Sequence, residues 1–202
     1  MTRTASIALA WLLGLCVAAA AAPQRSAPPV AFVAEQVVLH VEPDSLRVDA
    51  VYVLVCRQET AATQTTLAYP YPQDPLLGGA RTFQLACRLG AGDWQELSWR
   101  EMQNGLGARW SLPVAAGDTL RVRTTYRQAL RTTYARYIVT TTSAWRQPLQ
   151  IARFEIHLPV GAVPVEFSFP FERCGEDEQA AWCYETTDFL PDRDIIVRWR
   201  GP

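Results

Sequence analysis

Two histidine–glutamate pairs are the most suggestive arrangement of reactive side chains in the sequence. Glu42 lies two residues after His40, and Glu155 lies two residues before His157. Side chains two apart on a strand point to the same face, and imidazole and carboxylate groups are common metal ligands. Two such pairs on neighbouring strands could hold a metal ion. Both pairs lie on polar faces, however, where solvated side chains are the ordinary outcome, so we predict no metal site.

Motifs of nucleophilic, phosphate-binding, zinc-dependent or dinucleotide-dependent catalysis do not occur in the sequence. The sequence has no lysine, which excludes every lysine-dependent mechanism. Acidic segments at residues 172–178 and 188–194 lack the spacing of a calcium-binding loop. We therefore predict no cofactor and favour a non-enzymatic role. Because paired carboxylates can hydrolyse glycosides without a local motif, a secreted hydrolase or carbohydrate-active protein is the alternative.

The sequence contains seven tryptophans, which bear on ligand binding. Exposed indole rings can bind sugars or peptides, whereas buried rings fill the cores of β-sandwiches. Trp199 alternates with Ile195 and Val197, so we expect it in the core. The candidates for ligand binding are three tryptophans near turns and one at the end of a strand-like segment: Trp94, Trp99, Trp110 and Trp145.

The segment 134–148, YARYIVTTTSAWRQP, is rich in β-branched and aromatic residues, a composition typical of a half-buried strand. Pro148 cannot donate a ladder hydrogen bond and would end such a strand. We predict a long strand that ends at Trp145, with Val139 and Trp145 in the core. The alternative is a recognition surface for a glycan or a peptide, built from rings beside threonine and arginine donors.

Of the five cysteines, only Cys16 lies in the N-terminal apolar segment. An even number in an exported chain indicates disulfides. Cys174 and Cys183 bracket the acidic loop GEDEQAAW and are natural partners. Cys56 and Cys87 each share a strand face with apolar neighbours, and we predict that they form the second disulfide. Zinc is not expected, because no Cys-x-x-Cys pair occurs.

The N-terminus has the layout of a secretory signal peptide. Arg3 precedes an apolar run at residues 5–22 that ends in small residues. We predict a signal peptide at residues 1–22, followed by a flexible, proline-rich segment at 23–30. An uncleaved membrane anchor is the alternative, since the run is barely long enough to span a bilayer. It is the only membrane contact that we expect.

Charge and length limit the remaining possibilities. The net charge of −1 gives no basic field, so a nucleic-acid partner is not expected. All basic residues are arginines, which favours a GC-rich, bacterial origin. Residues 31–202 are enough for one domain with a substantial core.

The elements that must position these side chains are strands. Alternation of apolar and polar residues recurs in segments such as QVVLHV, TLRVRTTY and IARFEIHL. Turn sequences such as EPDS, GAGD and NGLG separate them. We predict an all-β, antiparallel, immunoglobulin-like sandwich of about ten short strands.

A resemblance points the same way. The sequence contains YPYP, then WSLP, then ARYIVTTTSAWRQPL and FEIHLP. This series resembles a group of bacterial exported all-β domains of unknown function, mainly over residues 126–159. The resemblance implies an immunoglobulin-like sandwich in the cell envelope, and it implies no catalytic residue.

These observations predict an exported, non-enzymatic binding or structural module of the bacterial cell envelope. We expect a periplasmic or extracellular location and an envelope protein or a glycan as partner. A membrane-anchored accessory subunit of an envelope complex is a further alternative.

Overall fold

The computed structural model describes residues 30–57, 63–175 and 181–201. The predicted signal peptide and proline-rich segment lie outside these residues, except for Val30. The described chain is all-β, with two short 3-10 helices, η1 (Gln103–Gly105) and η2 (Thr140–Trp145). No helix in this part of the chain is long and apolar enough to span a membrane.

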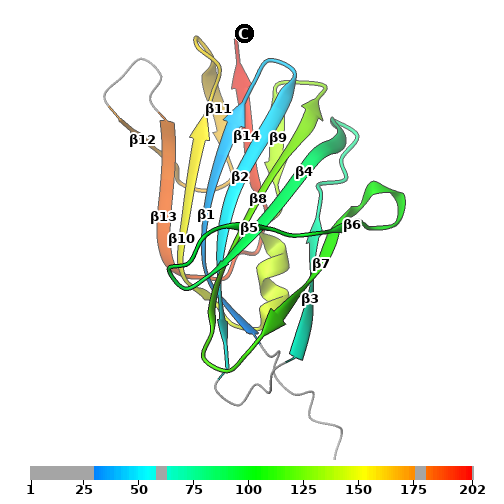
Figure 1. The fold of residues 1–202 in the computed structure, drawn as a ribbon. Coiled ribbons are helices and arrows are strands. Elements are labelled where there is room, and N and C mark those ends of the chain that lie inside the picture. The colour runs from blue at the N-terminus through cyan, green and yellow to red at the C-terminus, as the bar shows by residue number, and fades with distance from the viewer. Residues whose placement is uncertain (1–29, 58–62, 176–180, 202) are drawn as a thin grey trace, which may run out of the picture.

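The strands form one large sheet and two small ones (Figure 1). The large sheet has eight strands in the order β12 (Glu172–Cys174), β13 (Ala181–Phe189), β10 (Leu149–His157), β1 (Val30–Val41), β2 (Ser45–Cys56), β8 (Thr119–Leu130), β4 (Leu77–Leu89) and β5 (Gln95–Glu96). The second sheet has the order β11 (Val163–Phe167), β14 (Ile195–Arg200) and β9 (Tyr134–Tyr137). The third has the order β3 (Thr63–Pro70), β7 (Gly107–Val114) and β6 (Arg100–Glu101).

The prediction of an all-β fold is confirmed, but two of its details are wrong. The described residues form fourteen strands rather than about ten, and β1, β2 and β8 each span 12 residues. In addition, β1 and β10 pair in parallel, from Ala34 opposite Ile151 to His40 opposite His157. Local alternation reveals each strand but not the direction of its partner, because both kinds of pairing have the same side-chain period.

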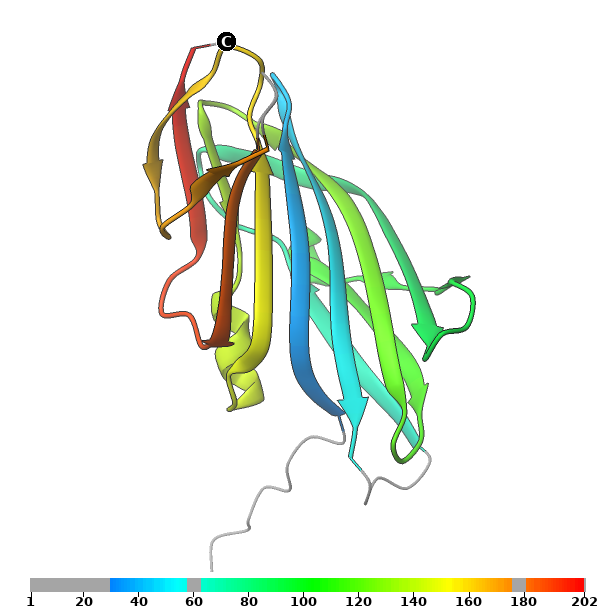
Figure 2. The ribbon, with the colours of Figure 1, turned by 90° about the vertical axis from the view of Figure 1, so that its left-hand side faces the viewer.

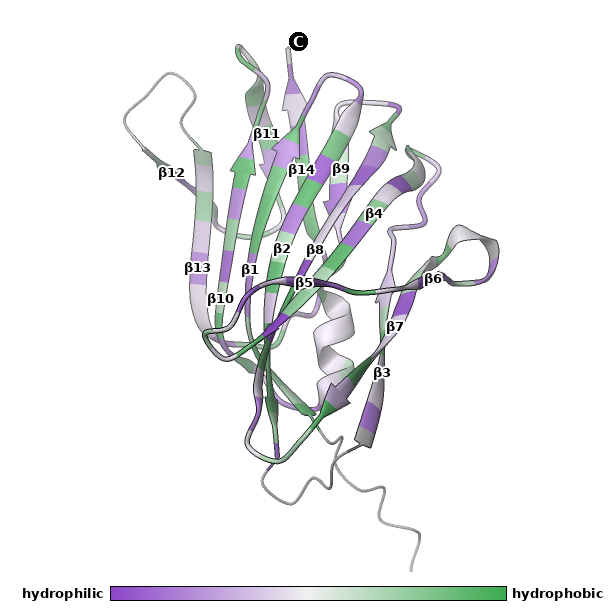
Figure 3. Ribbon diagram, in the orientation of Figure 1, coloured by the Kyte–Doolittle hydropathy of each residue, from purple (hydrophilic) through white to green (hydrophobic). Residues whose placement is uncertain are grey.

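The large sheet has an apolar inner face and a polar outer face. Along β8 the even-numbered residues from Leu120 to Gln128 are buried, and the arginines between them are half-buried or exposed. Figure 3 shows the resulting alternation of hydrophobic and hydrophilic bands on the long strands. Figures 1 and 2 show η2 and the β11–β14–β9 sheet on one side of the large sheet. The hydrophobic core lies between these layers.

The predicted strand over 134–145 is wrong beyond its first four residues. β9 ends at Tyr137, and residues 140–145 form η2. Val139 is buried, as predicted. Trp145 is only half-buried, with its ring 5.7 Å from that of Phe32. The cause of the early end is Asp194, whose carboxylate accepts hydrogen bonds from the backbone N–H groups of Val139 and Thr140.

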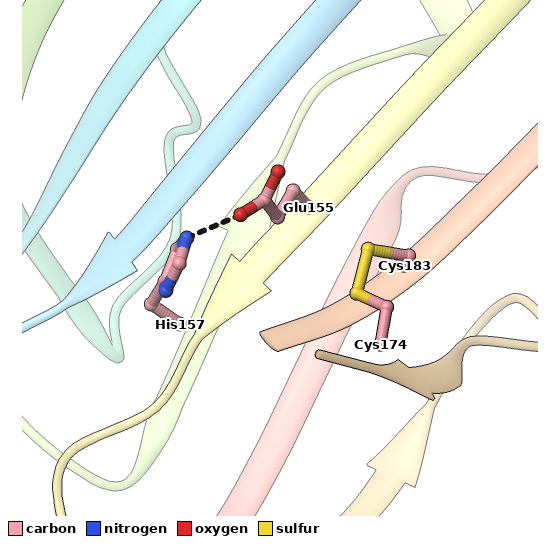
Figure 4. The surroundings of a disulfide bond; sticks show 4 residues. All are labelled: Glu155, His157, Cys174 and Cys183. Atoms are coloured by element: carbon pink, nitrogen blue, oxygen red, sulfur yellow. Dashed lines mark ion pairs between the residues drawn. A yellow bond between two sulfur atoms is a disulfide. The ribbon is translucent and has the colours of Figure 1, made fainter. Parts of the chain in front are cut away.

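One of the two predicted disulfides is present. Cys174 and Cys183 are bonded across the β12–β13 pair, with their Cα atoms 5.8 Å apart (Figure 4). The predicted Cys56–Cys87 bridge is wrong, and both residues are free thiols. Strand β8 lies between β2 and β4, so Cys56 and Cys87 are separated by two strand spacings, or about 10 Å. A disulfide needs Cα atoms within about 7 Å.

Candidate functional site

The candidate site is a pocket of about 90 Å³ between the inner face of the large sheet, strands β3 and β7, and η2. Ala68 on β3 and Thr141 on η2 are exposed lining residues, so the pocket reaches the surface between these two elements. The other lining residues are mostly apolar or aromatic: Phe32, Glu35, Tyr52, Leu54, Leu67, Tyr69, Pro70, Trp110, Val122, Tyr137, Ile138, Thr142 and Trp145.

A β-bulge in β1 brings Phe32 to the same face as Glu35. Phe32 pairs with Leu54 and Ala34 pairs with Val53, so Val33 has no residue opposite it. This extra residue changes which positions point inward, and β-bulges commonly re-aim side chains at functional sites. As a result, both Phe32 and Glu35 face the pocket.

One oxygen atom of the buried Glu35 carboxyl group is left without a hydrogen-bond partner. Only 5% of the residue is exposed, and its Oε1 atom has no hydrogen-bond partner. Burial disfavours the ionised form of a carboxyl group and raises the pKa of Glu35 to about 8. Buried polar groups without partners are uncommon, and a strongly shifted pKa in a pocket is a feature of functional sites.

Further polar atoms surround this carboxyl group. Tyr52 lies directly across the β1–β2 pair from Glu35, and its hydroxyl is 2.8 Å from the Tyr137 hydroxyl. The Tyr69 hydroxyl is buried beside these two groups but makes no hydrogen bond of good geometry. The Trp110 Nε1 atom is likewise buried without a partner. The pocket therefore offers several hydrogen-bonding atoms that the protein itself does not use.

Aromatic rings supply much of the remaining wall. The Phe32 ring is 5.7 Å from both the Tyr52 and the Trp145 rings, and the Tyr52 and Tyr69 rings are 6.0 Å apart. The position of Tyr69 depends on the close approach of β3 and β7. A side chain at Gly107 would collide with the Tyr69 carbonyl oxygen, so glycine is required there.

Asp194 fixes the wall that η2 contributes. It accepts five hydrogen bonds, from the Arg136 guanidinium, the Val139 and Thr140 backbone N–H groups and the Thr140 hydroxyl. Burial alone would raise the pKa of Asp194, but the hydrogen bonds from Thr140 and Arg136 outweigh burial and lower it. Asp194 therefore ties β14 to β9 and η2 and holds Thr141, Thr142 and Trp145 at the pocket.

The predicted ligand-binding tryptophans do not form one platform. Trp110 and Trp145 both line the pocket, with Trp110 buried and Trp145 half-buried. Trp99 is 37% exposed and packs its ring edge-on against Phe83, at 5.0 Å. Trp94 lies apart, with the guanidinium groups of two arginines each 4.7 Å from the centre of its ring. A ligand role for any of the four stays a prediction.

The two predicted histidine–glutamate pairs meet on the outer face of the large sheet. His40 and His157 are register partners whose rings stack at 4.8 Å. Glu155 is 2.6 Å from His157 (Figure 4), whereas Glu42 instead pairs with an arginine. Burial, Arg47 and the neighbouring His157 lower the pKa of His40. Within the described residues, no three histidine, cysteine, aspartate or glutamate side chains are arranged to hold a metal.

Glu35 is the main residue that sequence reasoning missed, although a signal was available. It precedes the predicted strand QVVLHV and has the same parity as Val37, Leu39 and Val41, the apolar face of that strand. A carboxylate on an apolar face is unusual and would have pointed to this position. No local signal was available for Tyr69, because β3 and β1 meet only through the tertiary fold.

Comparisons with known proteins bear on the fold. No protein-family model matches the chain, and no curated protein matches its sequence. A proposed nutrient-binding protein from Legionella pneumophila has a similar structure, with a TM-score of 0.64 and 15% identity over 86% of this chain and 68% of that one. At this identity the similarity is one of fold, and it agrees with the resemblance to all-β domains.

Two further solved structures have lower similarity. An M1 zinc metallopeptidase from Deinococcus radiodurans has a TM-score of 0.49 and 16% identity, over 85% of this chain and 42% of that one. A proposed protease from Parabacteroides distasonis has a TM-score of 0.47 and 10% identity, over 88% of this chain and 41% of that one. The chain therefore spans less than half of either protein.

Proposed function

We propose that this chain is a non-enzymatic binding module that takes a small ligand into the pocket around Glu35. The observation that carries the proposal is the buried Glu35 carboxyl group, whose Oε1 atom has no partner, at the wall of an aromatic pocket that reaches the surface. A ligand with a complementary polar group would satisfy this carboxyl group and repay its cost of burial. The similarity to a proposed nutrient-binding protein supports the same role.

The hydrolase alternative has less support at this pocket. A glycosidase of the usual kind needs two carboxyl groups on either side of the scissile bond. Among the described residues that line the pocket, Glu35 is the single carboxyl group. One carboxyl group with several hydroxyl and indole donors suits recognition better than paired acid–base catalysis.

Export to the bacterial cell envelope is part of the proposal. The Cys174–Cys183 disulfide supports an oxidising compartment, and the N-terminal sequence has the layout of a signal peptide. The sheets pack face to face around one core, which supports an immunoglobulin-like scaffold in a broad sense, although β1 and β10 run parallel. Retention of residues 5–22 as an anchor would instead make the chain a membrane-anchored subunit.

A glycan or an envelope protein as a larger partner is a separate proposal. The observation that favours it is the exposed ring of Trp99, which lines a groove with Arg100, Arg109 and Trp110 outside the pocket. This surface and the pocket share only Trp110, so changes at Trp99 and at Glu35 should affect different ligands.

Native mass spectrometry tests the binding function. Protein purified gently from the periplasm of an expressing bacterium should retain a small molecule of defined mass. Thr141→Trp should abolish retention, because it places an indole at the pocket mouth. Ala144→Trp is the matched control, since Ala144 is an exposed η2 residue that does not line the pocket. Equal retention of the small molecule by the two variants would contradict the proposal.

A further inference from the structure

We propose that the ligand of this pocket is a small organic cation, with an ammonium group at the Glu35 carboxylate and an apolar body between the aromatic rings. This inference rests on the proposed binding function and names its ligand class. The relevant geometry is that of Glu35, Phe32, Tyr52, Tyr69 and Trp145, which line one pocket from β1, β2, β3 and η2.

The charges at the pocket exclude an anion. None of the described lining residues is an arginine or a histidine, although the chain contains many arginines. The pocket is therefore neutral when Glu35 is protonated and negative when it is ionised. An anionic ligand would meet no positive charge there, and burying an unpaired charge is costly. An ammonium group would instead form an ion pair with the Glu35 carboxylate, whose Oε1 atom has no partner in the protein.

The aromatic wall favours the same class of ligand. Ring faces attract cations within about 6 Å of the ring centre, and such attraction is strongest where water is excluded. Phe32 is in contact with both Tyr52 and Trp145, so a body near Glu35 lies among several rings. Short aliphatic or aromatic groups attached to the ammonium would bury apolar surface against these rings.

Binding of a cation should displace one proton from Glu35. In the free protein burial raises the pKa of Glu35 to about 8, so the group is mostly neutral at pH 7. The ionisable groups that pack around it are Tyr52, Tyr69 and Tyr137, whose pKa values burial raises above their ordinary range. The other residues that line the pocket carry no ionisable group, and neither does Ala152, which lies opposite Glu35 on β10. The proton therefore leaves Glu35 for solvent as the ammonium–carboxylate pair forms.

The test compares three probes of similar size: n-butylammonium, 1-butanol and butyrate. Binding is followed by the NMR shift of the Trp110 indole N–H in the oxidised, full-length mature protein. We expect n-butylammonium to bind at least tenfold more tightly than 1-butanol, and butyrate not to bind. The affinity for n-butylammonium should rise about 50-fold between pH 6 and pH 8, because only the ionised fraction of Glu35 is competent. The affinity for 1-butanol should not change over this range.

Glu35→Gln removes the charge and keeps the shape of the side chain. It should abolish both the preference for n-butylammonium and the pH dependence, and leave 1-butanol binding within about twofold, since only the charge is lost. Glu155→Gln, on the outer face of β10, is the matched control. It should change neither the preference for n-butylammonium nor the pH dependence. If Glu35→Gln does not fold, the pH series on the unsubstituted protein decides alone.

The inference fails if 1-butanol or butyrate binds as tightly as n-butylammonium, or if n-butylammonium binds without pH dependence. Sensitivity of 1-butanol binding to Thr141→Trp would then show that the pocket binds ligands but not cations. Failure of n-butylammonium to bind at all would also overturn the ligand class. The retained mass in native spectra tests the binding function independently of these probes.

Discussion

Glu35 and Asp194 are carboxyl groups buried to the same extent, with 5% and 6% of each residue exposed, but their surroundings differ. Asp194 accepts five hydrogen bonds, two of them from a guanidinium group, and its pKa is lowered despite burial. Glu35 has no partner at Oε1, and burial raises its pKa to about 8. Burial alone therefore does not decide the role of a carboxyl group.

The comparison separates a binding group on β1, which lines the pocket, from a structural group that supports the η2 wall from behind. Asp194 is satisfied by the protein and holds η2 in place. Glu35 is left unsatisfied by the protein, so a ligand can satisfy it. Sites that carry such unfavourable groups reduce stability in exchange for function, and the two carboxyl groups should respond in opposite ways when they are removed.

The largest effect is expected for Asp194→Ala. Removing Asp194 leaves the half-buried Arg136 guanidinium with only a long contact to Asp74, at 3.9 Å, and two backbone N–H groups also lose their acceptor. The free energy of unfolding should fall by about 3–5 kcal/mol, measured by urea denaturation. Asp192→Ala is the control, because this side chain is 82% exposed and pairs loosely with Arg193 at 3.5 Å. A loss as small as that of the control would contradict the structural role of Asp194.

The two carboxyl groups should also act in different pH windows. Folded Glu35 keeps a proton that the unfolded chain releases above its ordinary pKa of 4.5, so the folded state loses stability as pH rises toward 8. Relative to Glu35→Gln, the unsubstituted protein should lose about 3 kcal/mol between pH 5 and pH 8. Asp194 has a lowered pKa, so its contribution is complete above its ordinary pKa of 3.8 and is lost as pH falls further. Urea denaturation across pH 3–9 measures both, and parallel curves for the protein and Glu35→Gln would contradict the assignment.

A smaller effect of opposite sign is expected for Glu35→Leu. The substitution removes an unpartnered buried polar group and fills the same space with apolar atoms, so the free energy of unfolding should rise by about 1–2 kcal/mol at pH 7. Glu155→Leu is the control on the outer face, where the carboxylate is 39% exposed, and it should change stability by less than about 0.5 kcal/mol. A clear destabilisation by Glu35→Leu would show that Glu35 is a structural residue after all.

Much of the fold follows from local sequence patterns. Alternation along β2, β8 and β10 predicts which residues are buried, because side chains of a strand point to opposite faces. The Cys174–Cys183 disulfide was predictable because both cysteines flank one short loop. These features depend on residues that are close in the sequence.

Features that depend on distant residues could not be predicted in this way. The η2 helix interrupts a strand-like sequence because Asp194, more than fifty residues later, captures the backbone N–H groups of Val139 and Thr140. Cys56 and Cys87 point to the same side, as expected, but β8 separates their strands. Phe32 lies on the same face as Glu35 because of a bulge at Val33, which the alternation of residue types alone does not reveal.

The most direct test of the central claim is the titration of the Glu35 carboxyl group itself, followed by carbon-13 NMR of side-chain-labelled protein. The resonance is assigned by its absence in Glu35→Gln. The structure predicts an apparent pKa of about 8 in the free protein, and the proposed ligand class predicts that saturating n-butylammonium lowers this pKa. An apparent pKa near the ordinary value of 4.5, unchanged by n-butylammonium, would contradict the claim.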